Sequence, residues 1–145
     1  MLKAGVLGAG HLGKIHLKLL QQSTKFTLVG FYDANQQAAE AVEQEYGYKS
    51  FPTMEALIQA CDMIDVVTPT IHHFKCAEKV ITAGKHLFIE KPITHTVTEA
   101  DMIRDLAKKH GVRGQVGQVE RFNPAFMAVN HMIDKPMFIE AHRLA

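Results

Sequence analysis

The chain has 145 residues, of which 47% are hydrophobic and 21% are charged, proportions close to those of ordinary globular proteins. A chain of this length can bury a proper core, so one folded domain is the default expectation and a disordered or fibrous chain is excluded. The formal net charge is +1 and charges of both signs are mixed along the chain, which argues against nucleic acid as a partner.

The sequence carries no targeting, membrane or metal-binding pattern. Met1 leads directly into strand-like sequence without the regions of a signal peptide, and no apolar run approaches the roughly 18 residues of a membrane span. Cys61 and Cys76 lack a C-x-x-C spacing, and no set of histidines and carboxylates has metal-ligand spacing. We therefore expect a cytoplasmic protein with no metal, no membrane contact and two apolar core cysteines.

Short apolar runs alternate with amphipathic segments in the first part of the chain. The pattern predicts helices at Gly13–Gln22 and Ala34–Tyr46, and strands at Leu2–Leu7, Phe26–Tyr32 and Tyr48–Phe51. The same alternation continues to residue 119. It predicts helices over 52–60, 72–83 and 98–110, strands over 64–68 and 87–89, and a sixth strand over 113–119.

Strands that alternate with helices need crossover connections, which are right-handed in nearly all cases. The predicted fold is therefore α/β, a Rossmann-type doubly wound parallel sheet with helices on both faces. We assign it to residues 1–122. Residues 123–145 are predicted as a linker helix over 124–133 and an extended segment over 137–144. This segment is either the first strand of a truncated second α+β domain or an edge strand of the same sheet.

A glycine motif, Gly8-Ala-Gly10-His11-Leu12-Gly13, joins the first strand to the first helix. Gly8 permits a tight turn, Gly10 lets the backbone approach a pyrophosphate, and Gly13 allows close packing of helix and strand. The main-chain N–H groups at His11 and Leu12 would then meet the phosphate charge. The alternative is a turn without a ligand, since glycines occur in many tight strand-to-helix turns.

Asp33 ends the second strand, twenty positions after Gly13, where a dinucleotide-binding unit places a carboxylate on the adenosine ribose. Such a carboxylate repels a 2′-phosphate, and Ala34 and Asn35 supply no cation to attract one, so NAD is the expected cofactor. The alternative for Asp33 is a helix N-cap or a turn residue.

The segments Ala-Gly-Lys-His before the fifth predicted strand and Glu90-Lys91-Pro92 after it, with Thr68-Pro69-Thr70 and His73 upstream, resemble the Gfo/Idh/MocA oxidoreductase family. The resemblance implies that Lys91 lies between nicotinamide and substrate as a catalytic residue, with Glu90 beside the cofactor. It also implies that the peptide before the proline is often cis.

The same resemblance places the residues after the fourth predicted strand, Thr68, Pro69, Thr70 and His73, on the nicotinamide ribose side of the cofactor. Many family members carry Asn at the position of Thr70. For His73 a helix residue bonded to nearby backbone is the alternative.

Glu-Arg121-Phe-Asn123-Pro is similar to a subgroup of the family that oxidises the 3-hydroxyl of UDP-N-acetyl-hexosamines or their uronates. Arg121 and Asn123 would then face the substrate, and an arginine can pair with phosphate or carboxylate. The alternative is a structural hinge in which Asn-Pro starts the next helix.

The resemblance implies an NAD-dependent dehydrogenase that moves hydride between a sugar or sugar-nucleotide hydroxyl and nicotinamide. It also implies a further domain that completes the active site and forms a homo-oligomer, so the chain alone is expected to be inactive. Two rival interpretations are a non-catalytic NAD-binding regulator and an interaction protein that keeps the fold without cofactor.

Overall fold

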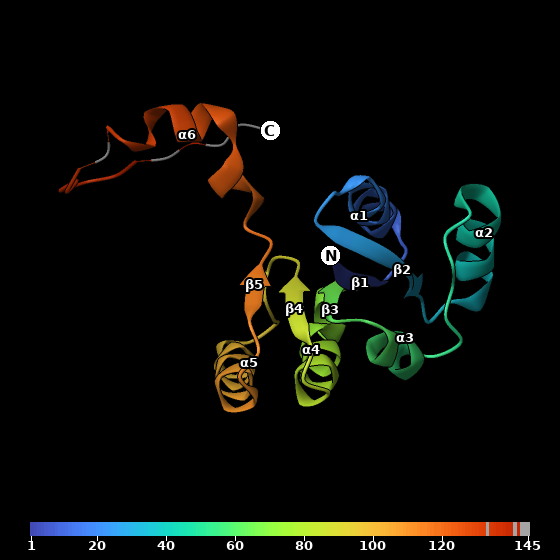
Figure 1. Ribbon diagram of the computed structural model, residues 1–145. Coiled ribbons are helices and arrows are strands. Elements are labelled where there is room, and N and C mark those ends of the chain that lie inside the picture. Colours follow the sequence, from blue (N-terminus) through green and yellow to red (C-terminus); the bar gives the residue numbers. More distant parts are fainter. Residues whose placement is uncertain (133, 141, 143–145) are drawn as a thin grey trace.

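A parallel sheet lies at the centre of the computed structural model, which describes residues 1–132, 134–140 and 142 (Figure 1). The sheet has five strands in the order β2-β1-β3-β4-β5. In chain order the strands are β1 (Leu2–Leu7), β2 (Phe26–Tyr32), β3 (Met63–Val66), β4 (His86–Ile89) and β5 (Gly114–Val116). The chain leaves β1 toward β2 in one direction and returns to β3 on the other side, so the order reverses between β1 and β3.

Helices cover the two faces of the sheet in separate groups (Figure 1). On one face α1 (His11–Gln22) and α2 (Gln36–Tyr46) bury Leu17, Ala39 and Val42 against Val6 and Phe31. On the other face α3, α4 and α5 pack on the larger core around Ile64 and Leu87. These helices span Met54–Ala60, His73–Thr82 and Val97–His110. The predicted doubly wound α/β fold is confirmed.

Local signals in the sequence explain where the helices begin and end. Thr96 and Glu99 form a reciprocal capping box at the start of α5, and Gly111 ends it with a left-handed backbone. Asn35 caps α2 by accepting a hydrogen bond from the amide of Ala38. Gly47 ends that helix with a left-handed backbone, as Gly111 ends α5. Within the described residues, no helix is long and apolar enough to cross a membrane, and no group of His, Cys, Asp or Glu is arranged to hold a metal.

The predicted strand at Tyr48–Phe51 is wrong. Ser50 forms a single bridge to Phe31, with hydrogen bonds that link Phe31 to the main chain of Lys49 and Phe51. The pairing stops there because β2 ends at Tyr32, one residue beyond Phe31. The strand predicted over 113–119 is also shorter, since β5 ends at Val116 and the chain turns into the 3₁₀ helix η2 (Val119–Phe122).

The segment after β5 extends away from the sheet (Figure 1). The helix α6 (Pro124–Asn130) is shorter than the predicted 124–133, and position 133 is outside the described residues. Residues 137–140 do not join the sheet, so the edge-strand alternative is wrong there, while the first strand of a second domain stays a prediction. Positions 141, 143 and 144 lie outside the described residues. A strand needs a partner to pair its main-chain groups.

Candidate functional site

The turn between β1 and α1 requires glycine at two positions. Gly8 has a φ of +96°, and a Cβ there would lie 2.8 Å from the carbonyl oxygen of Val67. A Cβ on Gly13 would clash with the carbonyl oxygen of Gly8. Both glycines therefore allow the backbone of the turn to pack closely, as the motif predicts.

Gly10 differs, because a Cβ there would meet no heavy atom within 4 Å. It is the N-cap residue of α1, where no side chain caps the helix and the first turn carries no acidic residue. His11 and Leu12 in that first turn are exposed. The structure thus presents main-chain N–H groups and the positive end of the helix dipole toward open space, an arrangement suited to a phosphate.

Asp33 is held in place at the carboxyl end of β2. One carboxylate oxygen accepts a hydrogen bond of 2.8 Å from the amide of Ala9, and the other accepts one of 2.8 Å from the amide of Asn35. Because Asn35 caps α2, the alternative in which Asp33 is the helix N-cap is wrong, while its bond to the amide of Asn35 is that of a turn residue. The carboxylate is fixed beside the glycine turn while its residue lines an open cleft.

This cleft, of about 450 Å³, lies at the carboxyl ends of β1, β2 and β3. It is therefore at the switch point of the sheet, where open α/β sheets bind ligands. Four of the residues proposed from the sequence line it, namely Gly8, Asp33, Thr68 and Pro69. Its other lining residues are Leu7, Tyr32, Ala34, Asn35, Met54, His72, Lys75, Cys76 and Lys79.

His73 does not line the cleft and is only 1% exposed. One ring nitrogen lies 2.9 Å from the carbonyl oxygen of Pro92, and the other lies 2.8 Å from that of Thr68. The geometry matches the alternative of a helix residue bonded to nearby backbone. The ring ties the loop after β4 to the turn after β3, which passes through Pro69 and Thr70 into the short 3₁₀ helix η1 (Thr70–His72).

Lys91 is exposed in the loop after β4, and its peptide bond to Pro92 is cis, as the resemblance implies. The Lys91 amide donates a hydrogen bond of 3.0 Å to the carboxylate of Glu90. The Glu90 side chain is only 14% exposed and turns toward His16 of α1. The structure therefore separates the neighbours, with the lysine at the surface and the glutamate in the interior.

Arg121 and Asn123 lie beyond β5, in exposed sequence around η2. The Asn123 side chain accepts from the amide of Ala125 and donates to Glu120 at 3.0 Å, so it starts α6 as the hinge alternative predicts. Neither residue lines the cleft. Contact of these residues with a substrate stays a prediction.

Sequence reasoning missed part of the cleft wall. His72 and Lys75, three residues apart at the start of α4, both line it, as does Met54 from the start of α3. The sequence contains a signal that could have identified His72 and Lys75. They follow the carboxyl end of β3, at the same sheet edge as Thr68 and Pro69, with the spacing of one helical turn.

The glycine turn, the uncapped helix start and the carboxylate beside the cleft define a dinucleotide-binding Rossmann domain. Residues 2–118 match the Gfo/Idh/MocA profile, described as an oxidoreductase family with an NAD-binding Rossmann fold. The chain belongs to this family.

Curated and solved relatives agree with this assignment. UDP-N-acetylglucosamine 3-dehydrogenase of Acidithiobacillus ferrooxidans is 34% identical over 145 residues, covering 99% of this chain and 46% of that protein. Its solved structure gives a TM-score of 0.83 over 90% of this chain and 43% of that one. Inositol 2-dehydrogenase of Rhizobium meliloti is 37% identical over 132 residues, or 90% of this chain and 40% of that protein. The chain thus spans less than half the length of these relatives.

Proposed function

We propose that this chain is the nucleotide-binding part of an NAD-dependent dehydrogenase that acts on a hydroxyl or ketone of a sugar or sugar nucleotide. The observation that carries this proposal is the open space above Gly10 at the uncapped start of α1, next to the fixed Asp33 carboxylate. NAD fits this arrangement, because a diphosphate needs donors without a side chain in the way and a ribose needs an acceptor.

The residues divide into cofactor-binding and positioning groups. The turn from Gly8 through Gly13, including Gly10, His11 and Leu12, would hold the pyrophosphate, and Asp33 would accept from the adenosine ribose. The residues Thr68, Pro69 and Thr70 would line the nicotinamide ribose side. His73, which has both ring nitrogens on main-chain carbonyls, would position that turn without contacting NAD.

Bound NAD would supply the nicotinamide carbon that takes up the hydride. Lys91 would hold or exchange the proton of the reacting hydroxyl, since it is exposed at the carboxyl edge of the sheet. Glu90 would hold the main chain of Lys91. Arg121 and Asn123 would lie on the substrate side, where an arginine pairs with phosphate or carboxylate.

Calorimetry with the purified chain tests the binding proposal. We expect NAD to bind and NADP to bind more weakly, because Asp33 repels a 2′-phosphate. Gly10→Ala should lower NAD affinity by at least about tenfold, or about 1.4 kcal/mol, since the added methyl group occupies the open space that the diphosphate needs. Thermal unfolding should stay at the wild-type temperature, because that methyl group meets no protein atom. No heat and no thermal stabilisation at millimolar NAD would refute the proposal.

Substrate and assembly are proposed by similarity to the longer relatives. A full-length protein should reduce NAD with a UDP-sugar, an inositol or an aldose, and absorbance of NADH identifies which. A response to inositol but not to UDP-sugars would remove the sugar-nucleotide assignment. We also propose a homo-oligomeric cytoplasmic enzyme that does not bind nucleic acid, with little or no turnover by this chain alone.

A further inference from the structure

A buried cluster of titratable side chains lies on the α1 face of the sheet, apart from the cleft. The Nδ1 atom of His16 is 2.8 Å from the carboxylate of Asp65, and its Nε2 atom is 3.5 Å from the carboxylate of Glu90. The side chains of His16, Asp65 and Glu90 are 14%, 6% and 14% exposed. They come from α1, β3 and the loop after β4, so the cluster connects three elements that border the cofactor site.

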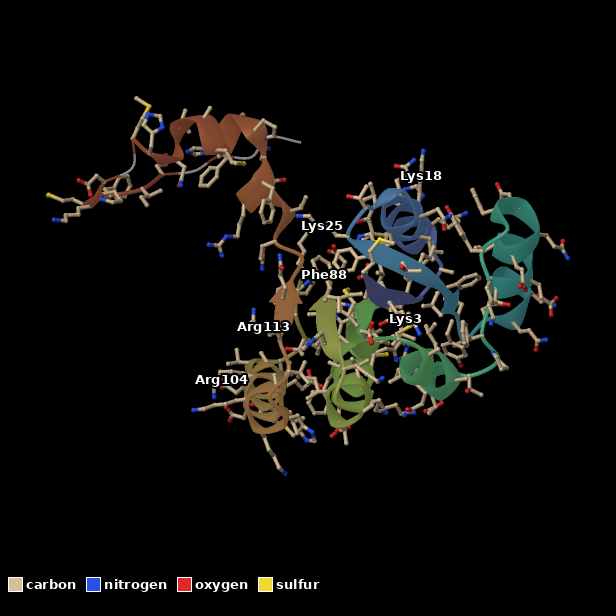
Figure 2. All side chains as sticks on the ribbon, in the orientation of Figure 1. Lys3, Lys18, Lys25, Phe88, Arg104 and Arg113 are labelled. Carbon is tan, nitrogen blue, oxygen red and sulfur yellow. The ribbon has the colours of Figure 1, made fainter. Side chains whose placement is uncertain are left out.

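The packing around the cluster is built to hold Glu90 in one place. A Cβ on Gly117 would lie 2.6 Å from the Glu90 carboxylate and 3.2 Å from the ring of Phe88. Phe88, labelled in Figure 2, lies with its ring centroid 6.1 Å from that of His16. The absence of a side chain at position 117 therefore leaves the space that the inward-turned Glu90 carboxylate occupies.

The cluster also contains a polar atom without a partner. The second carboxylate oxygen of Asp65 is buried and accepts no hydrogen bond within the described residues. Burying a carboxylate in this way is unfavourable unless the charge is compensated, and the ring of His16, when protonated, supplies a compensating charge in direct contact. A buried oxygen of this kind lowers stability and therefore calls for an explanation.

We propose that His16 is a positioning residue for the Lys91 loop: its ring, held by Asp65, fixes the Glu90 carboxylate, which in turn holds the main-chain amide of Lys91. The start of α1, five residues before His16, would bind the diphosphate, so one helix would hold the cofactor and orient the loop that carries the lysine. The role of Lys91 here rests on the proposed function. The link from His16 through Glu90 to the Lys91 amide does not depend on that function and can be tested without NAD.

Nuclear magnetic resonance of the 145-residue chain without NAD tests the link. The ring signals of His16 and the amide signal of Lys91 are followed from pH 5 to pH 9. Asp65 on β3 and Glu90 after β4 are the charged groups that face the ring, so their carboxyl signals are followed as well. We expect the Lys91 amide to shift with the midpoint of the His16 ring. A Lys91 amide with no inflection at that midpoint overturns the proposal, and this measurement needs no variant.

Variants give the second part of the test. In His16→Gln the inflection of the Lys91 amide should disappear, and its hydrogen exchange should become about tenfold faster, the loss expected for a hydrogen bond to a charged group. Gly117→Ala should speed exchange in the same direction by displacing Glu90. His110→Gln, an exposed histidine at the end of α5, is the matched control and should leave both properties unchanged. An inflection that persists in folded His16→Gln overturns the link. Absence of NAD binding by the wild-type chain instead overturns the proposed function.

Discussion

At the scale of single residues, the glycines of one motif have separable tasks. Gly13 serves packing, because its missing Cβ lets α1 lie against the carbonyl oxygen of Gly8. Gly10 has no such packing task, because nothing in the protein occupies the space that its side chain would fill, and we propose that this space admits the ligand. The motif as read from the sequence cannot separate these tasks, since it specifies three glycines and no surroundings.

Gly13→Ala should therefore lower stability as well as binding. The added methyl group meets rigid backbone, so we expect a loss of about 2 kcal/mol or more in the free energy of unfolding. For a chain of this size the melting temperature should fall by about 4 to 8 °C. Differential scanning calorimetry measures the melting temperatures of Gly13→Ala, Gly10→Ala and the wild type, and Gly10→Ala should melt like the wild type. Equal melting temperatures for all three proteins would contradict this division of tasks.

The pair of His16 and Asp65 makes stability depend on pH. The hydrogen bond to Asp65 raises the pKa of His16 above its usual value of 6.5, and burial raises the pKa of the Asp65 carboxyl. In both cases the folded state binds the proton more tightly than the unfolded state, so stability falls as pH rises. The contribution of His16 is complete below about 6.5 and is lost as pH rises through its raised value.

Urea unfolding at pH 6 and pH 9 checks this dependence. We expect the wild-type free energy of unfolding to be lower at pH 9, and His16→Gln to lose less over the same interval because it lacks the titrating ring. His110→Gln should behave as the wild type does. Identical changes with pH in the wild type and His16→Gln would show that another group is responsible.

At the scale of elements, the capping box of α5 is a purely local device. Thr96 and Glu99 satisfy each other's main-chain donors, on a helix that contributes no residue to the cleft. Thr96→Ala should cost about 1 kcal/mol of stability, or about 2 to 4 °C in melting temperature. The NAD affinity of Thr96→Ala, measured by calorimetry, should equal that of the wild type. A loss of affinity would mean that α5 shapes the site.

Elements were predictable where local signals decide them. The segments β1 and β2 have the predicted bounds because apolar runs close at a glycine turn and at Asp33. The segment 48–51 has equally strand-like residues, but β2 ends at Tyr32, so the segment forms one bridge only. Strand pairing depends on tertiary structure, and the β-propensity of the residues alone does not predict it.

The site was predictable to a similar extent. Gly8, Asp33, Thr68 and Pro69 line the cleft because motif spacing and the sheet edge fix their places. The contact of His16 with Asp65 and Glu90 was not foreseen, because these residues are far apart in sequence and meet only when β3 lies between β1 and β4. His73 shows the same limit, since its partners are main-chain carbonyls that carry no sequence signal.

At the scale of the whole molecule, the sheet places all proposed cofactor contacts at one edge, and the chain beyond β5 contributes little to that edge. Residues 124–130 of α6 are all exposed, and the element that α6 contacts most is η2. Phe126, Met127 and Phe138 are among the apolar side chains left open to solvent in this segment. Large exposed apolar surface of this kind marks a region that packs against something else.

We therefore predict that residues 1–122 are a complete nucleotide-binding domain. A chain that ends at Phe122 should melt within about 2 °C of the 145-residue chain, because less than about 1 kcal/mol of packing is removed. Its NAD affinity should be unchanged, while binding of a dye that fluoresces on apolar surfaces should fall with the loss of Phe126 and Phe138. Calorimetry measures the NAD affinity, thermal unfolding the melting temperature, and fluorescence the dye binding. A melting temperature lower by more than about 5 °C would mean that the segment after β5 belongs to the domain core.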